Sequence, residues 1–73
     1  MLGTEAPEEA MVERIALREA IDQLPEKERM TILLRYFKSL TQEQTARILG
    51  VSQVQVSRLE RRGLQHLRES FGL

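Results

Sequence analysis

Two helix-start signals lie close together in the second half of this chain, and a glycine separates them. Thr41 with Gln44, and Ser52 with Gln55, each match a capping box, in which the two side chains bond each other's backbone N–H groups. A helix that begins after Thr41 must therefore end before Ser52. Gly50 is the residue type that most readily ends it. The spacing predicts a short helix, a tight turn and a second helix.

The segment after Ser52 could be a strand or a helix when its first residues are taken alone. Val54 and Val56 alternate with polar residues, which is typical of a strand. Further along, apolar residues and a glycine recur at helical spacing: Val56, Leu59, Gly63, Leu67 and Phe71. This pattern favours a helix of about 18 residues. On that helix Val54 and Arg58 face away from the apolar stripe.

The N-terminal part of the chain predicts two more helices. Gly3 lies among small and acidic residues, so we expect residues 1–7 to be a flexible lead-in. Apolar residues at helical spacing then predict a helix over about 8–23. Pro25, followed by acidic residues in the first turn, predicts the start of another helix that ends near residues 38–39.

These elements predict an all-α fold, a small four-helix domain over residues 8–73. Ala46 is small where two helices would cross, and Gly50 follows it at the turn. Apolar residues surround both positions: Leu49, Val51, Val56 and Leu59. This pattern is typical of a helix-turn-helix, here over residues 41–63, whose second helix enters the major groove of DNA.

Composition excludes several other classes of function. The chain has no cysteine, so it cannot use a thiolate nucleophile or cysteine-ligated zinc. Its one histidine, His66, has no nucleophile in a recognisable arrangement, and we expect it to be solvated or to cap a helix. The carboxylates are expected on solvent-facing positions and match no metal-ligand pattern. We therefore predict no enzyme activity, no metal and no cofactor.

The absence of long apolar runs bears on the location of the protein. No run approaches the roughly 20 residues that a membrane span needs. The start of the chain also lacks the basic-then-apolar order of a signal peptide. We therefore expect a cytoplasmic protein with no membrane partner.

The net charge of zero conceals an uneven distribution along the chain. Residues 1–28 contain eight acidic and three basic side chains, whereas residues 29–73 contain three acidic and eight basic ones. The C-terminal part could therefore face a polyanion that would repel the N-terminal part. The alternative is that the uneven charge only reflects two ordinary helical surfaces that face solvent.

Most of the chain resembles a known family. From Leu24 to Arg68 the sequence reads LPEKERMTILLRYFKSLTQEQTARILGVSQVQVSRLERRGLQHLR, which resembles region 4 of bacterial sigma factors. The run VSQVQVSRLE is most similar to the sporulation and stress-response sigma factors. The resemblance implies recognition of the minus-35 promoter element within the RNA polymerase holoenzyme and docking on the flap of the β subunit. Since a complete sigma factor has further domains, we expect this chain to be an excised part of one.

The resemblance also implies which residues read DNA bases. It places Gln53, Val54, Ser57 and Arg58 on the base-facing side of the recognition helix. Arg58 could bond a guanine edge, Gln53 could pair with adenine, and Val54 could meet a thymine methyl group. Gln55 has two competing roles, because the capping box would hold its side chain back from the groove.

Other residues are better suited to the phosphate backbone. Thr41 and Gln42 lie at a predicted helix N-terminus, where free N–H groups favour an anion. Arg61 and Arg62 extend the basic surface. Arg35 could also bind phosphate, or it could instead pair with an acidic residue of the N-terminal part.

The first two helices are expected to carry a partner surface. In the family, the β flap packs into an apolar groove near these helices, and anti-sigma factors often use overlapping surfaces. Ile21, Leu33 and Phe37 are the candidates here, although such a stripe can equally be core. Two other functions remain open: the DNA-binding output domain of another helix-turn-helix regulator, and a helical protein-docking module.

Overall fold

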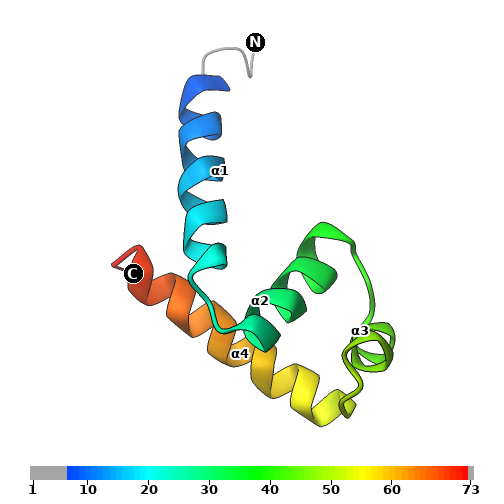
Figure 1. The fold of residues 1–73 in the computed structure, drawn as a ribbon. Helices are drawn as coiled ribbons and strands as arrows, with labels where there is room; N and C mark the ends of the chain where they lie inside the picture. Colours follow the sequence, from blue (N-terminus) through cyan, green and yellow to red (C-terminus); the bar gives the residue numbers. More distant parts are fainter. Residues whose placement is uncertain (1–6, 73) are drawn as a thin grey trace.

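The computed structural model describes residues 7–72, and within them the chain folds into four α-helices and one π-helical segment (Figure 1). The elements are α1 (Pro7–Asp22), α2 (Glu26–Ile32), η1 (Leu33–Phe37), α3 (Gln42–Leu49) and α4 (Gln53–Ser70). The predicted all-α fold with four helices is confirmed, and the described residues contain no strand. The predicted lead-in lies outside the described residues except for Pro7, which already belongs to α1.

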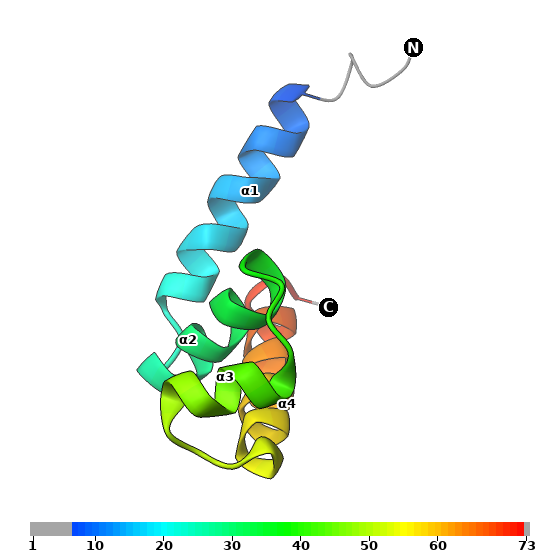
Figure 2. The ribbon, with the colours of Figure 1, turned by 90° about the vertical axis from the view of Figure 1, so that its right-hand side faces the viewer.

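The core lies where the end of α1 and the length of α2 meet the second half of α4. Ile21, Leu24, Ile32 and Leu67 form its buried centre, and Leu17, Ala20 and Leu33 pack against them. The helix-turn-helix contributes two further buried apolar residues, Val56 of α4 and Ala46 of α3. Helix α4 is therefore the common support for the other three helices (Figures 1 and 2).

Gly63 allows α2 to approach α4 closely. A Cβ atom at this position would lie 3.0 Å from Cγ1 and 3.2 Å from Cδ1 of Ile32. Because Ile32 is itself buried, it has little room to move away. The predicted place of Gly63 in the buried stripe is confirmed. Phe71, which the same pattern included, lies just after α4 and is exposed, because the helix ends at Ser70.

The second predicted helix differs from the observed one in its last turn. The chain winds as an α-helix to Ile32 and then as a π-helix, in which the N–H of Lys38 donates to the carbonyl of Leu33 at 3.1 Å. The following turn places Ser39 in the left-handed region, with φ of 58°. The wider turn of a π-helix has no compositional signal, so the sequence predicted one uninterrupted helix.

The turn between α3 and α4 has the predicted geometry. Gly50 adopts φ of 72°, and both Gly50 and Val51 donate their N–H groups to the carbonyl of Ala46, at 2.8 and 3.0 Å. The bond from Gly50 is the 5→1 bond of an αL cap, and the bond from Val51 is the 6→1 bond found in Schellman motifs. Both satisfy the carbonyl of Ala46, and the turn needs a residue that tolerates positive φ. The turn fixes where α4 begins.

Helix α1 reaches beyond the rest of the molecule. Its C-terminal end packs on the core, while its first turns extend away from the other helices (Figures 1 and 2). Ile15, on the extending part, is exposed. None of the helices in residues 7–72 combines the length and the apolar character that a membrane span needs.

Candidate nucleic-acid interface

The first two turns of α4 present a row of side chains to solvent. Gln53, Val54 and Arg58 are exposed, and Val54 keeps 59% of its surface accessible. Ser57 lies at the edge of this face and is half-buried. The predicted outward direction of Val54 and Arg58 is therefore confirmed. Val54 gives this face an apolar group that a ligand could contact, and the charged side chain of Arg58 beside it stays exposed.

Gln55 is held by the helix cap, as one of its two predicted roles required. Its side-chain oxygen accepts the N–H of Ser52 at 3.1 Å, while the hydroxyl of Ser52 accepts the N–H of Gln55 at 3.1 Å. The side-chain amide N–H groups are the part of Gln55 that could still donate to a base. Its predicted base contact thus competes with the start of α4.

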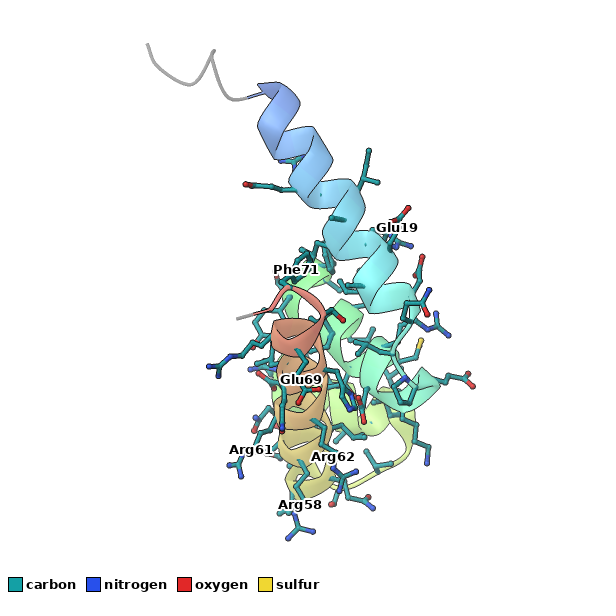
Figure 3. The ribbon with its side chains drawn as sticks, turned by 90° about the vertical axis from the view of Figure 1, so that its left-hand side faces the viewer. Glu19, Arg58, Arg61, Arg62, Glu69 and Phe71 are labelled. Atoms are coloured by element: carbon teal, nitrogen blue, oxygen red, sulfur yellow. The ribbon has the colours of Figure 1, made fainter. Side chains whose placement is uncertain are left out.

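Arginines surround this face and come from successive turns of the same helix. Arg58, Arg61 and Arg62 are exposed and project from α4 in different directions (Figure 3). Lys27, from the first turn of α2, lines a shallow pocket together with Arg58 and Arg62. The sequence pattern did not single out Lys27, because only the packing of α2 on α4 brings it to this side.

The start of α3 is organised by its own cap. The hydroxyl of Thr41 accepts the N–H of Gln44 at 3.0 Å, and the side chain of Gln44 accepts the N–H of Thr41 at 2.9 Å. Both capping boxes predicted from the sequence are therefore present. Thr41 is exposed and Gln42 is half-buried. The hydroxyl hydrogen of Thr41 is not used by the cap and could be donated to an anion.

Arg35 forms an ion pair inside the molecule. Its Nε donates to Glu60 at 3.1 Å, and its Nη1 donates to the carbonyl of Leu40 at 2.8 Å. Tyr36 donates its hydroxyl to the other carboxylate oxygen of Glu60 at 2.6 Å. The alternative that Arg35 pairs with an acidic residue is thus observed, but the acid is on α4 and not in the N-terminal part. We call Arg35, Tyr36 and Glu60 the clamp.

The clamp changes the acidity of two of its groups. Burial on its own would raise the pKa of Glu60, but the hydrogen bonds from Tyr36 and Arg35 together hold that pKa below its ordinary value. The hydrogen bond to Glu60 raises the pKa of Tyr36, and partial burial adds to this effect. Glu60 is therefore a carboxylate at neutral pH, and the Tyr36 hydroxyl keeps its proton.

A second acid is buried between α2 and α4. Glu28 has a side chain that is 8% exposed, and its Oε1 lies 2.7 Å from Nδ1 of His66. His66 is therefore not simply solvated or a helix cap, because its ring contacts a buried carboxyl group. Glu28 and Glu60 also contradict the expectation that the acids face solvent. Both partners are far away in the sequence, so helical periodicity did not indicate them.

The predicted partner surface is only partly accessible. Ile21 is 1% exposed and belongs to the core, so the prediction that it docks a partner is wrong. Leu33 is half-buried and packs against the same core, whereas Phe37 is 54% exposed. Phe37 lines an apolar groove between α1 and η1 with residues that were not among the predicted docking candidates: Arg14, Ile15, Leu17 and Arg18.

The described residues define a helix-turn-helix domain with a basic outward helix, and they contain no group of acidic or histidine side chains that could hold a metal ion. The chain belongs to the family described as Sigma-70, region 4, which matches residues 20–69. The predicted family resemblance is thereby confirmed.

Curated relatives agree with this assignment. The RNA polymerase sigma-F factor of Bacillus subtilis is 49% identical over 61 residues, covering 84% of this chain and 24% of that protein. The RNA polymerase sigma-F factor of Kitasatospora aureofaciens is 50% identical over 70 residues, covering 94% and 24%. The RNA polymerase sigma-G factor of Clostridium acetobutylicum is 36% identical over 62 residues, covering 85% and 24%. The chain spans about a quarter of the length of these relatives.

Proposed function

We propose that this chain is the DNA-binding, C-terminal domain of an RNA polymerase sigma factor and that it recognises the minus-35 promoter element during transcription initiation. The observation that carries the proposal is the outward face of α4, where Gln53, Val54 and Arg58 are exposed on a doubly capped helix-turn-helix of this family. An exposed face of this kind fits the major groove, which is wide enough to admit an α-helix.

Each side chain on that face suits a particular base edge. The fork of N–H groups on Arg58 matches the two acceptors of guanine, and the amide of Gln53 matches the donor and acceptor of adenine. Val54 offers an apolar contact to the methyl group of thymine. Ser57 can bond either kind of edge from the margin of the face. Gln55 contributes through its amide N–H groups where the cap leaves them available.

Phosphate contacts set the position of the helix in the groove. Arg61 and Arg62 flank the base-reading face, and Lys27 extends the same basic surface onto α2. Thr41 and Gln42 offer a hydroxyl and N–H groups at the start of α3. These contacts carry no sequence information themselves, and they make the affinity fall as salt is added.

The partners of the whole protein follow from the same proposal. The apolar groove between α1 and η1 is the site where we place the flap of the RNA polymerase β subunit, with Phe37 and Ile15 as its exposed apolar residues. An anti-sigma factor could cover an overlapping surface. Action on RNA polymerase places the protein in the cytoplasm. The proposed function needs neither a catalytic step nor a cofactor.

Substitution of Arg58 tests this function. We expect Arg58→Ala to lower the ratio of the affinity for a duplex with a sigma-F-type minus-35 element to the affinity for a scrambled duplex at least fivefold. The reason is that a good base contact contributes about 1–3 kcal/mol of discrimination. Arg68→Ala, which removes the same charge from the last turn of α4, is the control. Fluorescence anisotropy at low salt measures both. Equal losses for the two variants, or no preference of the wild type for the promoter duplex, would contradict the proposal.

A further inference from the structure

Glu60 lies in an unexpected place for an acidic residue. It follows the base-reading residues on α4, and its neighbours along the helix include Arg58, Arg61 and Arg62. A carboxylate on this helix would repel the phosphates of bound DNA if it pointed outward. Its side chain is instead 14% exposed and turned toward η1. The position therefore needs a role that outweighs the electrostatic disadvantage.

The contacts of Glu60 indicate that role. One carboxylate oxygen accepts Nε of Arg35 at 3.1 Å, and the other accepts the hydroxyl of Tyr36 at 2.6 Å. Both donors come from η1, so a single carboxylate joins the recognition helix to the π-helical segment. Hydrogen bonds to a charged acceptor are stronger than those between neutral groups, and two of them fix the direction of the carboxylate.

Arg35 connects Glu60 to the start of α3. Besides its bond to Glu60, it donates Nη1 to the carbonyl of Leu40, the residue directly before the Thr41 cap. These two bonds use two of the five N–H groups of the guanidinium. The Arg35 side chain remains 26% exposed, so the other N–H groups can be reached from outside. Arg35 is thus held at a fixed place between α3 and α4 with donors to spare.

We propose that Glu60 is a positioning residue for DNA binding, which holds Arg35, with Tyr36 as a second support, so that the remaining N–H groups of Arg35 bind a DNA phosphate next to the start of α3. The inference rests on the proposed function, because it concerns the same interface. Glu60 then favours the binding of a polyanion although it is itself acidic. It acts through Arg35 and makes no contact of its own with DNA.

Glu60→Gln, compared with Glu43→Gln, separates positioning from charge. Glu43 is an exposed acid on α3 that pairs with Arg47 of the same helix at 3.2 Å, so both variants remove one negative charge near the interface. Charge alone predicts that both bind DNA more tightly. We expect Glu43→Gln to do so and Glu60→Gln to bind the promoter duplex at least fivefold more weakly than Glu43→Gln. Anisotropy titrations at four salt concentrations provide affinity and salt slope together.

The salt slope distinguishes a lost phosphate contact from a loss of fold. Losing one phosphate contact decreases the steepness of the fall of log K with log salt by about 0.9. We expect this decrease for Glu60→Gln and for Arg35→Gln, and no further decrease in the double variant, because both act on the same contact. Tyr36→Phe retains the Arg35–Glu60 pair and should show a smaller loss in the same direction. It also serves as the test if Glu60→Gln does not fold.

An NMR signal reports the positioning directly. The Nε–H resonance of Arg35 should be protected in the wild type, shift on addition of the promoter duplex, and lose its protection in Glu60→Gln. If Glu60→Gln retains the wild-type salt slope and matches Glu43→Gln in affinity, the inference is wrong while the proposed function stands. If the wild type shows no preference for the promoter duplex, both are wrong.

Discussion

Thr45 is the residue whose surroundings fit its chemistry least well. Its side chain is fully buried in α3, and its hydroxyl has no hydrogen-bond partner among the described residues. Thr31 in α2 is equally buried, but its hydroxyl donates to the carbonyl of Lys27 at 2.7 Å. A buried polar group without a partner loses the hydrogen bonds that water gave it in the unfolded chain. The two threonines therefore form a natural comparison.

We predict that Thr45→Val raises the free energy of unfolding by about 1 kcal/mol, because it removes a polar group that has lost its hydration and keeps the shape of the side chain. Thr31→Val is the matched control and should be neutral or destabilising, since it removes a hydrogen bond that is made. Urea unfolding followed by circular dichroism measures both values. A loss of stability for Thr45→Val equal to that of Thr31→Val would show that the Thr45 hydroxyl is satisfied in solution.

Residue positions could be predicted from the sequence where they depend on helical periodicity. Val54 and Arg58 were placed on the outward side because they lie opposite the apolar stripe, and the structure agrees. Glu60 was not singled out, because its partners Arg35 and Tyr36 are 25 and 24 positions away. An acid within an arginine-rich helix was the signal present in the sequence. Ile21 was misassigned because core and groove residues share one apolar pattern.

At the scale of elements, the two capping boxes determine where α3 and α4 begin. Ser52 is the more informative position for the proposed function, because it sets the first turn of the helix that carries the proposed base-reading residues. Its hydroxyl and backbone N–H both take part in the box, at 3.1 Å each. A cap residue satisfies N–H groups that have no partner within the helix. Loss of the cap should therefore affect the start of α4 first.

We predict that Ser52→Ala lowers the free energy of unfolding by about 1 kcal/mol, the usual contribution of an N-cap side chain. Ser52→Asp should recover most of it, because aspartate also caps helices well. Ser70→Ala, at the exposed end of the same helix, is the control and should change little. Amide hydrogen exchange should show faster exchange at Gln55 in Ser52→Ala than in the wild type. Unchanged stability would mean that the tertiary contacts alone fix the start of α4.

The clamp makes the junction of η1 and α4 depend on pH. The pKa of Glu60 is lower in the folded state than its ordinary value of 4.5. Its contribution to stability is therefore present above that value and is lost as the pH falls through the folded-state pKa. The pKa of Tyr36 is raised above 10.0, so its contribution is present below that pH and is lost as the pH rises through the folded-state pKa.

We predict that the stability difference between the wild type and Glu60→Gln is constant from pH 6 to 8 and shrinks below about pH 4.5. Urea unfolding at a series of pH values measures this difference. Glu43→Gln is the control, because its acid is exposed and its pair with Arg47 lies within one helix. A difference that stays constant down to pH 3 would contradict the assigned role of the Glu60 carboxylate.

The sequence predicted the elements well where caps and glycine mark their ends. Gly50 and the two boxes gave the bounds of α3 and the start of α4. The π-helical turn of η1 could not be predicted, because residues 33–37 have the composition of an ordinary helix. This turn matters for the site, since it brings two neighbouring side chains, Arg35 and Tyr36, to the same carboxylate.

At the scale of the whole molecule, the first turns of α1 and the first turns of α4 lie at different ends (Figure 2). The molecule extends over 43 × 25 × 16 Å, with α1 reaching away from the helix-turn-helix (Figure 2). The basic side chains Arg58, Arg61 and Arg62 lie on α4 (Figure 3). A polyanion bound to the first turns of α4 would therefore lie away from the first turns of α1 (Figure 2). The groove between α1 and η1 remains accessible to a protein partner at the same time.

We predict that Phe37→Ser weakens binding of a β-flap fragment at least fivefold and leaves promoter affinity unchanged, because a central aromatic side chain often contributes more than 1 kcal/mol to an interface. Phe71→Ser is the control, since Phe71 is also exposed but does not line the groove. Isothermal titration calorimetry with the flap fragment measures the change. Equal effects of the two variants would place the flap elsewhere on the domain.

The most direct test of the central claim, that the outward face of α4 reads promoter DNA, is an NMR titration of ¹⁵N-labelled protein at low salt. A short duplex with a sigma-F-type minus-35 element is compared with a scrambled duplex of the same composition. We predict shifts concentrated at residues 41–42 and 53–62, larger for the promoter duplex. Identical shifts with the two duplexes, or shifts confined to α1 and η1, would contradict the claim.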